Sequence, residues 1–438
     1  MARGKKKESL TPEERLQAAL VPESEQPYKV PENWCWTYFK SISTIQTGKK
    51  DANYGSDEGK YPFFTCAAEP IRCHGYSFDC RAILLAGNGD INNISRYNGK
   101  FEAYQRTYVV KIAEPLCFDY IFYWFKYRWF DFNKGKMFGT AIPYIRLGNL
   151  QEFPTPIPPL AEQQRIVDRI ESLFAKLDEA KEKAQAVVDS FETRKAAILH
   201  KAFAGELTAK WREEHGVRME SWGKKRLSDV VTEFKYGTSE KSDYNNKGIP
   251  VLRIPNIGDN GIDLSDIKYL NHRNVDSESQ IHEGDILIIR SNGSRDLVGK
   301  AVLVPEFGCE YAYASFLIRA KPNHSIINAH YLTIFLNSTD ARGQMFRRAK
   351  SSAGINNINT KELGAISLTV PSLPEQDEIV HIINEMMDKD QQSKEAAEAV
   401  LDQIDLMKKS ILARAFRGEL GTNDPNEESA VELLKQLI

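Results

Sequence analysis

The chain has 438 residues and a formal net charge of −2 at pH 7, with 42% hydrophobic and 27% charged residues. Length and composition predict a soluble globular protein of two or three domains. The charge argues against a broadly basic nucleic-acid coat protein but allows local positive patches. No apolar run is long enough for a membrane span or a signal peptide, so neither is expected.

The chain opens with a polar arm, residues 1–30, in which Thr11–Glu14 has the pattern of a short helix start. Residues 31–157 then alternate short strand-like runs with turn signals, and Tyr120–Phe130 is an aromatic, helix-like run. Strands mixed with one or two helices predict a globular α+β domain. We interpret the aromatic run as core packing, with a base-stacking surface as the alternative.

Residues 158–215 predict a helical spacer. From Ile166 to Ile198, apolar residues recur in alternating steps of four and three, interrupted only by Arg194. This is the heptad pattern of a helix that packs along another helix. Prolines precede the first turn and Gly205 follows the last one, as is typical of helix ends. About 40 residues would make a rod of roughly 60 Å.

Residues 216–370 repeat, more weakly, the order of segments in 31–157: strand, Asn-Gly turn, Gly-Lys, strand, helix and basic stretch. This order predicts a second α+β domain. Residues 371–420 repeat the start of the helical spacer clearly, at an ungapped offset of about 213 residues and with about 22 of 50 positions identical. A second helical spacer is therefore expected there. Residues 421–438 form an acidic tail that is expected to be solvated.

The two spacers are expected to pair with each other, because one such helix leaves its apolar seam uncovered. The predicted fold is α+β: two α/β domains separated by two long antiparallel coiled-coil helices, with a pseudo-two-fold internal repeat. Asp390 and Ser393 interrupt the second seam, and we expect them to fix its register. The seam pattern also includes Val400 and Met407. The predicted helix-pair interface is Ile166, Ile170, Leu173, Leu177, Phe191, Ile198, Ile379, Ile383, Met386, Ile404 and Ile411.

Sequence signatures of catalysis are missing. The chain has no phosphate-binding G-x-x-x-x-G-K-[ST], no H-E-x-x-H, no G-x-S-x-G and no [ND]-P-P-Y of base-flipping methyltransferases. Cys66, Cys73 and Cys80 are spaced too widely for a typical zinc site, and reduced thiols are the better interpretation. We expect a binding protein without a metal or cofactor of its own.

Two kinds of segment suit DNA binding. The Asn-Gly turns suit base reading, because Arg pairs with guanine and Asn with adenine in the major groove; the alternative is a plain hairpin turn with positive φ. The basic, Gly-containing stretches suit phosphate contact, with a solvated charge run as the alternative. The predicted DNA-binding residues are Asn88, Asn92, Asn93, Arg96, Lys100, Lys134, Lys136, Arg290, Asn292, Ser294, Arg295, Lys300, Arg347, Arg348 and Lys350.

This order of segments resembles the specificity subunit of type I restriction–modification enzymes. The resemblance lies in the Pro-Pro-Leu-x-Glu-Gln-Gln opening at 158–164, the Pro-Ser-Leu-Pro-Glu-Gln opening at 371–376, and the Ala-Phe-x-Gly-Glu-Leu closings at 202–207 and 415–420. Trp222–Val230 also looks like the start of the family's second target recognition domain.

The resemblance implies that 31–157 and 216–370 are target recognition domains, each reading one half of a bipartite double-stranded DNA target. The spacers 158–215 and 371–420 would set the gap and dock two methyltransferase subunits, which restriction/translocase subunits would join. S-adenosylmethionine, ATP and Mg²⁺ would bind those partners. The arm would pack near the second helix, and the protein would be cytoplasmic and prokaryotic.

Three other functions fit the sequence less well. One is the specificity chain of a fused, type II-like system, and another is a coiled-coil scaffold without a nucleic-acid role. A catalytic nuclease would need clustered acids for a metal ion, and the sequence has no convincing cluster.

Overall fold

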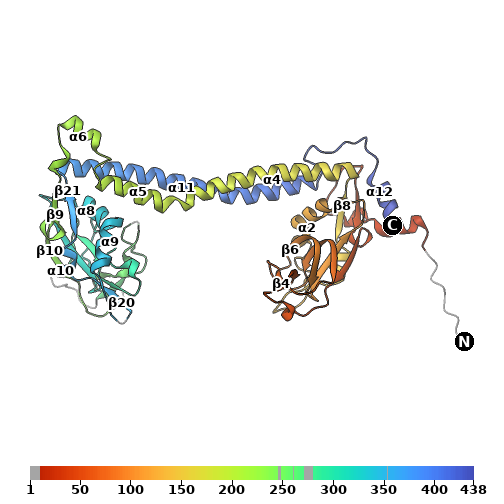
Figure 1. Ribbon diagram of the computed structural model, residues 1–438, viewed down its shortest axis with the longest axis horizontal. Coiled ribbons are helices and arrows are strands. Elements are labelled where there is room, and N and C mark those ends of the chain that lie inside the picture. Colours follow the sequence, from red (N-terminus) through yellow and green to blue (C-terminus); the bar gives the residue numbers. More distant parts are fainter. Residues whose placement is uncertain (1–9, 245–247, 260, 271–279, 353) are drawn as a thin grey trace. The chain divides into compact units, whose positions relative to one another are not determined.

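The computed structural model describes residues 10–244, 248–259, 261–270, 280–352 and 354–438. The first nine residues of the predicted arm therefore lie outside the described residues. The chain divides into two compact units: unit 1 is Met1–Ala184 with Ala399–Ile438, and unit 2 is Gln185–Glu398. Each unit combines a mixed α/β head with parts of the long helices (Figure 1).

The head of unit 1 is built on a six-stranded sheet that is antiparallel except for the parallel pair β3–β6. Its strands, in spatial order, are β2 (Ser43–Thr47), β7 (Thr107–Ile112), β5 (Phe78–Ala86), β6 (Ile94–Ala103), β3 (Tyr61–Phe64) and β4 (Ile71–Cys73). A two-stranded ribbon, β1 (Cys35–Tyr38) with β8 (Pro154–Ile157), and the short helix α3 (Leu147–Gln151) complete the head.

Helix α2 (Phe118–Asn133) supplies most of the aromatic core of this head. Tyr120, Trp124, Phe125 and Trp129 are fully buried, so the interpretation of this run as core packing is confirmed. Most of the rings around Phe153 are tilted or edge-on to it, which is a favoured geometry of aromatic clusters.

Among the residues that the structure describes, the head of unit 2 has four smaller sheets. The first sheet has, in spatial order, β10 (Val231–Tyr236), β18 (Leu317–Pro322), β14 (Ile286–Ile289) and β16 (Ala301–Leu303). The second has β11 (Ser242–Asp243), β13 (Lys268–Leu270), β12 (Pro250–Leu252) and β17 (Ala312–Tyr313). The third has β15 (Ser291–Asn292), β20 (Ile355–Asn357) and β19 (Lys350–Ser352), and the fourth pairs β21 (Ser367–Val370) with β9 (Gly223–Arg226). The helices are α7 (Leu227–Val230), α8 (Ala329–Leu336), α9 (Thr339–Arg348) and α10 (Thr360–Gly364).

The predicted spacers are helical, but the first one is interrupted. It consists of α4 (Leu160–Asp189) and α5 (Phe191–Phe203), separated at Ser190, and α6 (Ala209–His215) follows. The second spacer is one helix of 43 residues, α11 (Leu373–Ala415). Gly205 and Gly418 lie at φ +79° and +75°, so each spacer ends on a left-handed glycine as predicted.

The long helices pair antiparallel within each unit. In unit 1, Lys408 pairs with Asp178 and Lys181 with Asp405, so higher numbers on α4 meet lower numbers on α11. The α+β prediction with two mixed domains and long antiparallel helices is confirmed.

The predicted helix-pair residues are buried or half-buried, but they do not all serve the seam. Ile166 and Ile170 belong to the core of head 1, and Ile379 and Ile383 to the core of head 2. The first turns of α4 and α11 are thus parts of the heads. The other predicted positions are Leu173, Leu177, Phe191, Ile198, Met386, Ile404 and Ile411, of which Ile404 is buried and the rest are half-buried.

The seam prediction was wrong at Val400 and Met407, which are 41% and 46% exposed. The half-buried position next to Met407 is Lys408, whose Nζ lies 5.1 Å from the ring centre of Phe174 on α4. A lysine can lie along an apolar surface and still keep its charge in water or in an ion pair. Lys408 therefore displaces the regular seam by one residue.

The tail prediction was also wrong. Residues Ala430–Leu437 form helix α12, and Ala430 and Leu434 are buried. They share the core of unit 1 with Leu16 and Ala19 of α1 (Pro12–Ala19), the helix of the arm. The acidic residues of this segment predicted a solvated tail, whereas the apolar spacing within 430–437 makes it an amphipathic helix. The arm lies against this terminal helix and against β1, where Val21 N donates to Trp36 O at 3.0 Å.

Candidate nucleic-acid interface

Two segments that lie well apart in the sequence meet in head 1. Gly89 N of the Asn-Gly turn donates to Pro143 O at 2.8 Å, and Ile145 N donates to Gly87 O at 2.9 Å. Asn88 also forms a β-bridge with Tyr144. The turn after β5 is therefore joined to the loop that follows the basic stretch. We call residues 87–93 with 134–146 the turn-and-hairpin site of head 1.

Head 2 has the equivalent arrangement. Asn292 on β15 pairs with Asn356 on β20, and Ile358 N donates to Arg290 O at 2.9 Å. Residues 290–295 with 350–352 and 354–358 form the turn-and-hairpin site of head 2. In Figure 1, β20 lies at the end of head 2 that is remote from the long helices of unit 2. Ile145 and Ile358 are related by the same offset as the helix motifs, so the repeat includes these sites.

Each site exposes an apolar side chain at its hairpin. Ile142 is 60% exposed and Ile355 is 52% exposed, and the repeat offset again relates the two positions. Single exposed apolar residues are common on protein surfaces. Exposure at the same position of both hairpins is harder to attribute to chance, because neither side chain contributes to the core of its head.

Each site also holds an arginine over an aromatic ring. The guanidinium of Arg146 lies 3.9 Å from the ring centre of Phe138, and that of Arg290 lies 4.4 Å from the ring centre of Tyr236. Such stacking fixes the plane of the guanidinium, which suits it for bidentate pairing. Arg146 and Tyr236 were not among the residues predicted from the sequence. The repeat offset relates Arg146 to Asn359, and the two residues are the N-caps of α3 and α10.

The predicted DNA-binding residues of head 1 have different surroundings. Asn88 lies in the site and Asn92 is exposed there, whereas the amide of Asn93 donates to Cys66 O at 3.1 Å and so holds a neighbouring loop. Arg96 pairs with Asp119 and lies over Phe122. The remaining residues are exposed: Lys100 over Tyr76, Lys136 over Phe132, and Lys134 at the C-cap of α2.

The predicted residues of head 2 also divide. Arg290, Asn292 and Ser294 lie in the turn, where Asn292 accepts a hydrogen bond from Ser294 N at 2.8 Å. Arg295 donates to Phe346 O at 3.0 Å. On α9 and β19, Arg347 is exposed, Arg348 donates to Gln344 O at 3.1 Å, and Lys350 is 84% exposed beside Glu362.

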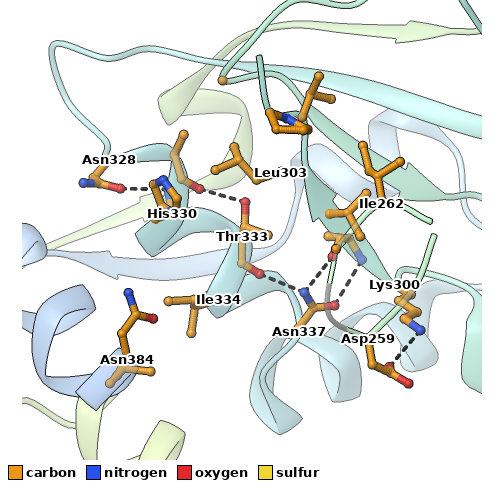
Figure 2. Close-up of a pocket in the computed structure, with 18 of the residues that line it drawn as sticks. Asp259, Ile262, Lys300, Leu303, Asn328, His330, Thr333, Ile334, Asn337 and Asn384 are labelled. Atoms are coloured by element: carbon orange, nitrogen blue, oxygen red, sulfur yellow. Dashed lines mark hydrogen bonds and ion pairs between the residues drawn. The ribbon is translucent and has the colours of Figure 1, made fainter. Parts of the chain in front are cut away.

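Lys300 does not lie with the other predicted residues. Its Nζ is 2.8 Å from Asp259, on the wall of a groove of about 1300 Å³ (Figure 2). The groove lies within unit 2, between α8 with its neighbouring strand on one side and α5 with α11 on the other. Thr333 of α8 and Asn337, the C-cap of that helix, line the groove, and the Asn337 amide donates to Ala301 O. The charge of Lys300 is paired in the head's own structure.

The Glu-Gln pair of each helix opening joins its helix to its head. Glu162 accepts from Trp34 Nε1 at 2.8 Å and from Thr422 Oγ1 at 3.2 Å. Glu375 accepts from Trp222 Nε1 at 2.9 Å and pairs with Arg212 at 2.6 Å. Burial raises the pKa of Glu162, although its hydrogen-bond donors act in the opposite direction.

The glutamines act in the same way in both units. Gln163 accepts from Cys117 N at 2.8 Å, at the N-cap of α2, and donates to Pro158 O at 3.0 Å. Gln376 accepts from Asn328 N at 2.7 Å, at the N-cap of α8, and donates to Pro371 O at 2.9 Å. The repeated motif thus satisfies backbone groups where helix and head meet.

Two heads, each carrying the same turn-and-hairpin site and the same helix attachment, define a two-headed binding protein. The model of the type I restriction modification DNA specificity domain family matches residues 31–188 and 219–401. The chain therefore belongs to this family. Its role is DNA-sequence recognition within a restriction–modification complex, and not catalysis. Neither the scaffold nor the fused-system interpretation receives support from these matches.

Named relatives agree with this assignment. The type I restriction enzyme EcoDI specificity subunit of Escherichia coli is 27% identical in an alignment that covers 93% of this chain and 95% of that one. The EcoKI specificity subunit of Escherichia coli K12 is 29% identical in an alignment that covers 68% of this chain and 66% of that one. The HsdS subunit of Thermoanaerobacter tengcongensis has the same fold, with a TM-score of 0.62 at 19% identity over 91% of this chain and 100% of its own.

The structure was also compared with the requirements of a metal site and of a membrane-spanning helix. Among the residues that the structure describes, no group of three or more His, Cys, Asp or Glu side chains is arranged to hold a metal ion. Within the same residues, none of the helices is both long enough and apolar enough to cross a bilayer.

Proposed function

We propose that each head reads one half of a bipartite DNA target through its turn-and-hairpin site. The observation that carries this proposal is the repetition of the whole site in both heads, with exposed Ile142 and Ile355 at equivalent positions. Apolar side chains contact thymine methyl groups, and arginine and asparagine pair with guanine and adenine in the major groove. Arg146 and Asn88 in head 1, and Arg290 and Asn356 in head 2, are the polar readers in this proposal.

The exposed cations beside each site position the heads on the DNA backbone. They are Lys134 and Lys136 in head 1 and Arg347 and Lys350 in head 2. Phosphate contacts fix register and orientation on the duplex without carrying sequence information. This division of labour gives Arg96, Asn93, Arg295 and Lys300 structural roles in their own heads.

The helix pair sets the gap between the half-sites and binds the partners. A helix of 43 residues such as α11 is about 64 Å long, enough to hold two readers a helical turn of DNA or more apart, about 34 Å. Val400, Leu406 and Met407 of α11 are 41%, 64% and 46% exposed, and they offer an apolar surface for a helical partner. Two methyltransferase subunits dock on the helices in this proposal, and restriction/translocase subunits join them. S-adenosylmethionine, ATP and Mg²⁺ bind those partners.

Deletion of the gene, followed by sequencing of methylated bases in the host genome, tests this function. A methylated motif of two half-sites with a fixed gap should be present in the parent strain and vanish on deletion. Complementation with the wild-type gene should restore it. A continuous motif, or a bipartite motif that survives the deletion, would contradict the proposal.

A further inference from the structure

Arg194, which interrupts the first seam, contacts Asp390, one of the two residues that interrupt the second seam. Arg194 Nε on α5 lies 2.5 Å from Asp390 Oδ1 on α11, both within unit 2. The side chain of Asp390 is only 11% exposed. A buried charge without a partner is costly, whereas a paired one is tolerated. The interruptions are therefore complementary.

The same guanidinium also contacts the end of α4. Arg194 Nη1 donates to Val187 O at 3.1 Å and to the hydroxyl of Ser190, which itself donates to Ala186 O at 2.6 Å. Ser190 is the residue at which α4 gives way to α5. One side chain thus joins three structures: the end of α4, the start of α5 and the continuous helix α11.

The pair breaks the symmetry of the repeat. At the repeat offset, the positions equivalent to Asp390 and Arg194 are Leu177 and Met407, which are both apolar. A slip of one heptad would bring Arg194 opposite Ile383 or Ala397, where its charge would lack a partner. The ion pair between Arg194 Nε and Asp390 Oδ1 forms in the observed register, and a slip of one heptad would separate its two charges.

We propose that Arg194 and Asp390 form a register lock that holds the broken helix against α11 in one arrangement and so restricts the accepted gap between half-sites to one length. This inference rests on the proposed function. It adds two specificity-determining residues that touch no DNA. Polar pairs in coiled coils specify register at a cost in stability.

The test replaces both partners with leucine, R194L with D390L, in the assembled methyltransferase complex. Methylation is measured on a plasmid library that carries the two native half-sites at varied gaps. The double variant should stay folded, with an unchanged or higher melting temperature. A slip of one heptad moves one helix about 10 Å along the other, or about three base pairs of duplex. The double variant should therefore methylate gaps about three base pairs longer or shorter at no less than about one tenth of the native rate, a tenfold preference corresponding to ~1.4 kcal/mol. The control K183Q with E179Q removes an exposed ion pair of α4 and should keep the native gap.

Single substitution separates the lock from general stability. D390L leaves Arg194 facing an apolar seam and should lower the melting temperature below that of the double variant. A double variant that keeps only the native gap, or that is folded but methylates no gap, would overturn the lock. Wild-type protein that methylates no bipartite site would instead refute the proposed function, so the two failures are distinguishable.

Discussion

At the scale of single residues, the proposed reading role of the hairpin isoleucines can be tested without disturbing the fold. Ile355 is 52% exposed, so Ile355→Ser should leave stability nearly unchanged. If this side chain is buried against a base, its loss should weaken binding to the half-site that head 2 reads by about 1–2 kcal/mol. Fluorescence anisotropy of the assembled complex on labelled duplexes measures this. Leu264→Ser, at a residue of the same head that is 44% exposed, is the matched control and should bind normally. Equal affinities for both variants would remove Ile355 from the reading site.

The buried attachment of α11 makes a second residue-scale prediction. Glu375→Ala removes the acceptor of Trp222 and the partner of Arg212, whose side chain is 10% exposed. The uncompensated arginine should cost about 3–5 kcal/mol of unfolding free energy. Urea unfolding followed by tryptophan fluorescence measures this. Glu214→Ala breaks an exposed pair with Lys210 and should change stability by less than about 1 kcal/mol. Similar losses in both variants would contradict a structural role for Glu375.

Glu162 predicts a dependence on pH. Its pKa is raised in the folded chain by burial, so the folded state holds the proton more tightly than the unfolded state does. Below its ordinary value of 4.5 both states are protonated and nothing is lost. As pH rises above that value, the wild type should lose stability relative to Glu162→Gln, until the folded-state pKa is passed. Urea midpoints between about pH 4 and pH 8 should show this trend. A difference between wild type and Glu162→Gln that stays constant over this range would count against the raised pKa of Glu162.

At the scale of elements, the terminal helix α12 is expected to contribute to the stability of unit 1, whose core it shares. Leu434 is fully buried beside the arm, so Leu434→Ala should destabilise unit 1 by about 2–5 kcal/mol. Gln436→Ala on the exposed side of the same helix should have little effect. Urea unfolding of both variants checks this, and equal stability of the two would mean that the helix is dispensable.

Much of this element pattern was predictable, because helix periodicity and an ungapped repeat are local signals. The two long helices, their glycine ends and the aromatic core helix follow from residue spacing alone. Other features depend on contacts distant in sequence. The displacement of the seam by Lys408 requires Phe174, and the burial of α12 requires Leu16. The short strands of head 2 have two to six residues, too few for a clear alternation.

The candidate site was predictable in part for the same reason. Asn-Gly turns and basic stretches mark surface segments, and the structure joins them in each head. The sequence does not reveal which cations already have a partner within the head. Arg96 is held by Asp119 and Lys300 by Asp259, both through residues distant in the chain. Arg146 and Tyr236 were missed because their stacking geometry exists only in the folded heads.

At the scale of the whole molecule, the chain is a duplicated reader in which each copy contributes a head and a long helix. Each long helix begins in one head, where its Glu-Gln motif attaches it. The phenylalanine of the Ala-Phe-x-Gly-Glu-Leu closing of the other copy packs in the core of that same head. Phe416 packs on Trp124 in unit 1, and Phe203 packs on Tyr331 in unit 2. The proposed function assigns half-site identity to the heads and gap length to the helices, so the two properties should be separable by mutation.

The most direct test inserts one heptad into each long helix, after Ala184 and after Glu398, where the two compact units divide. Seven residues add about 10 Å, or about three base pairs of duplex. The methylated motif of a host carrying this variant should keep both half-sites and lengthen its gap by that amount. A variant that methylates the original gap, or that changes the bases of either half-site, would contradict the account.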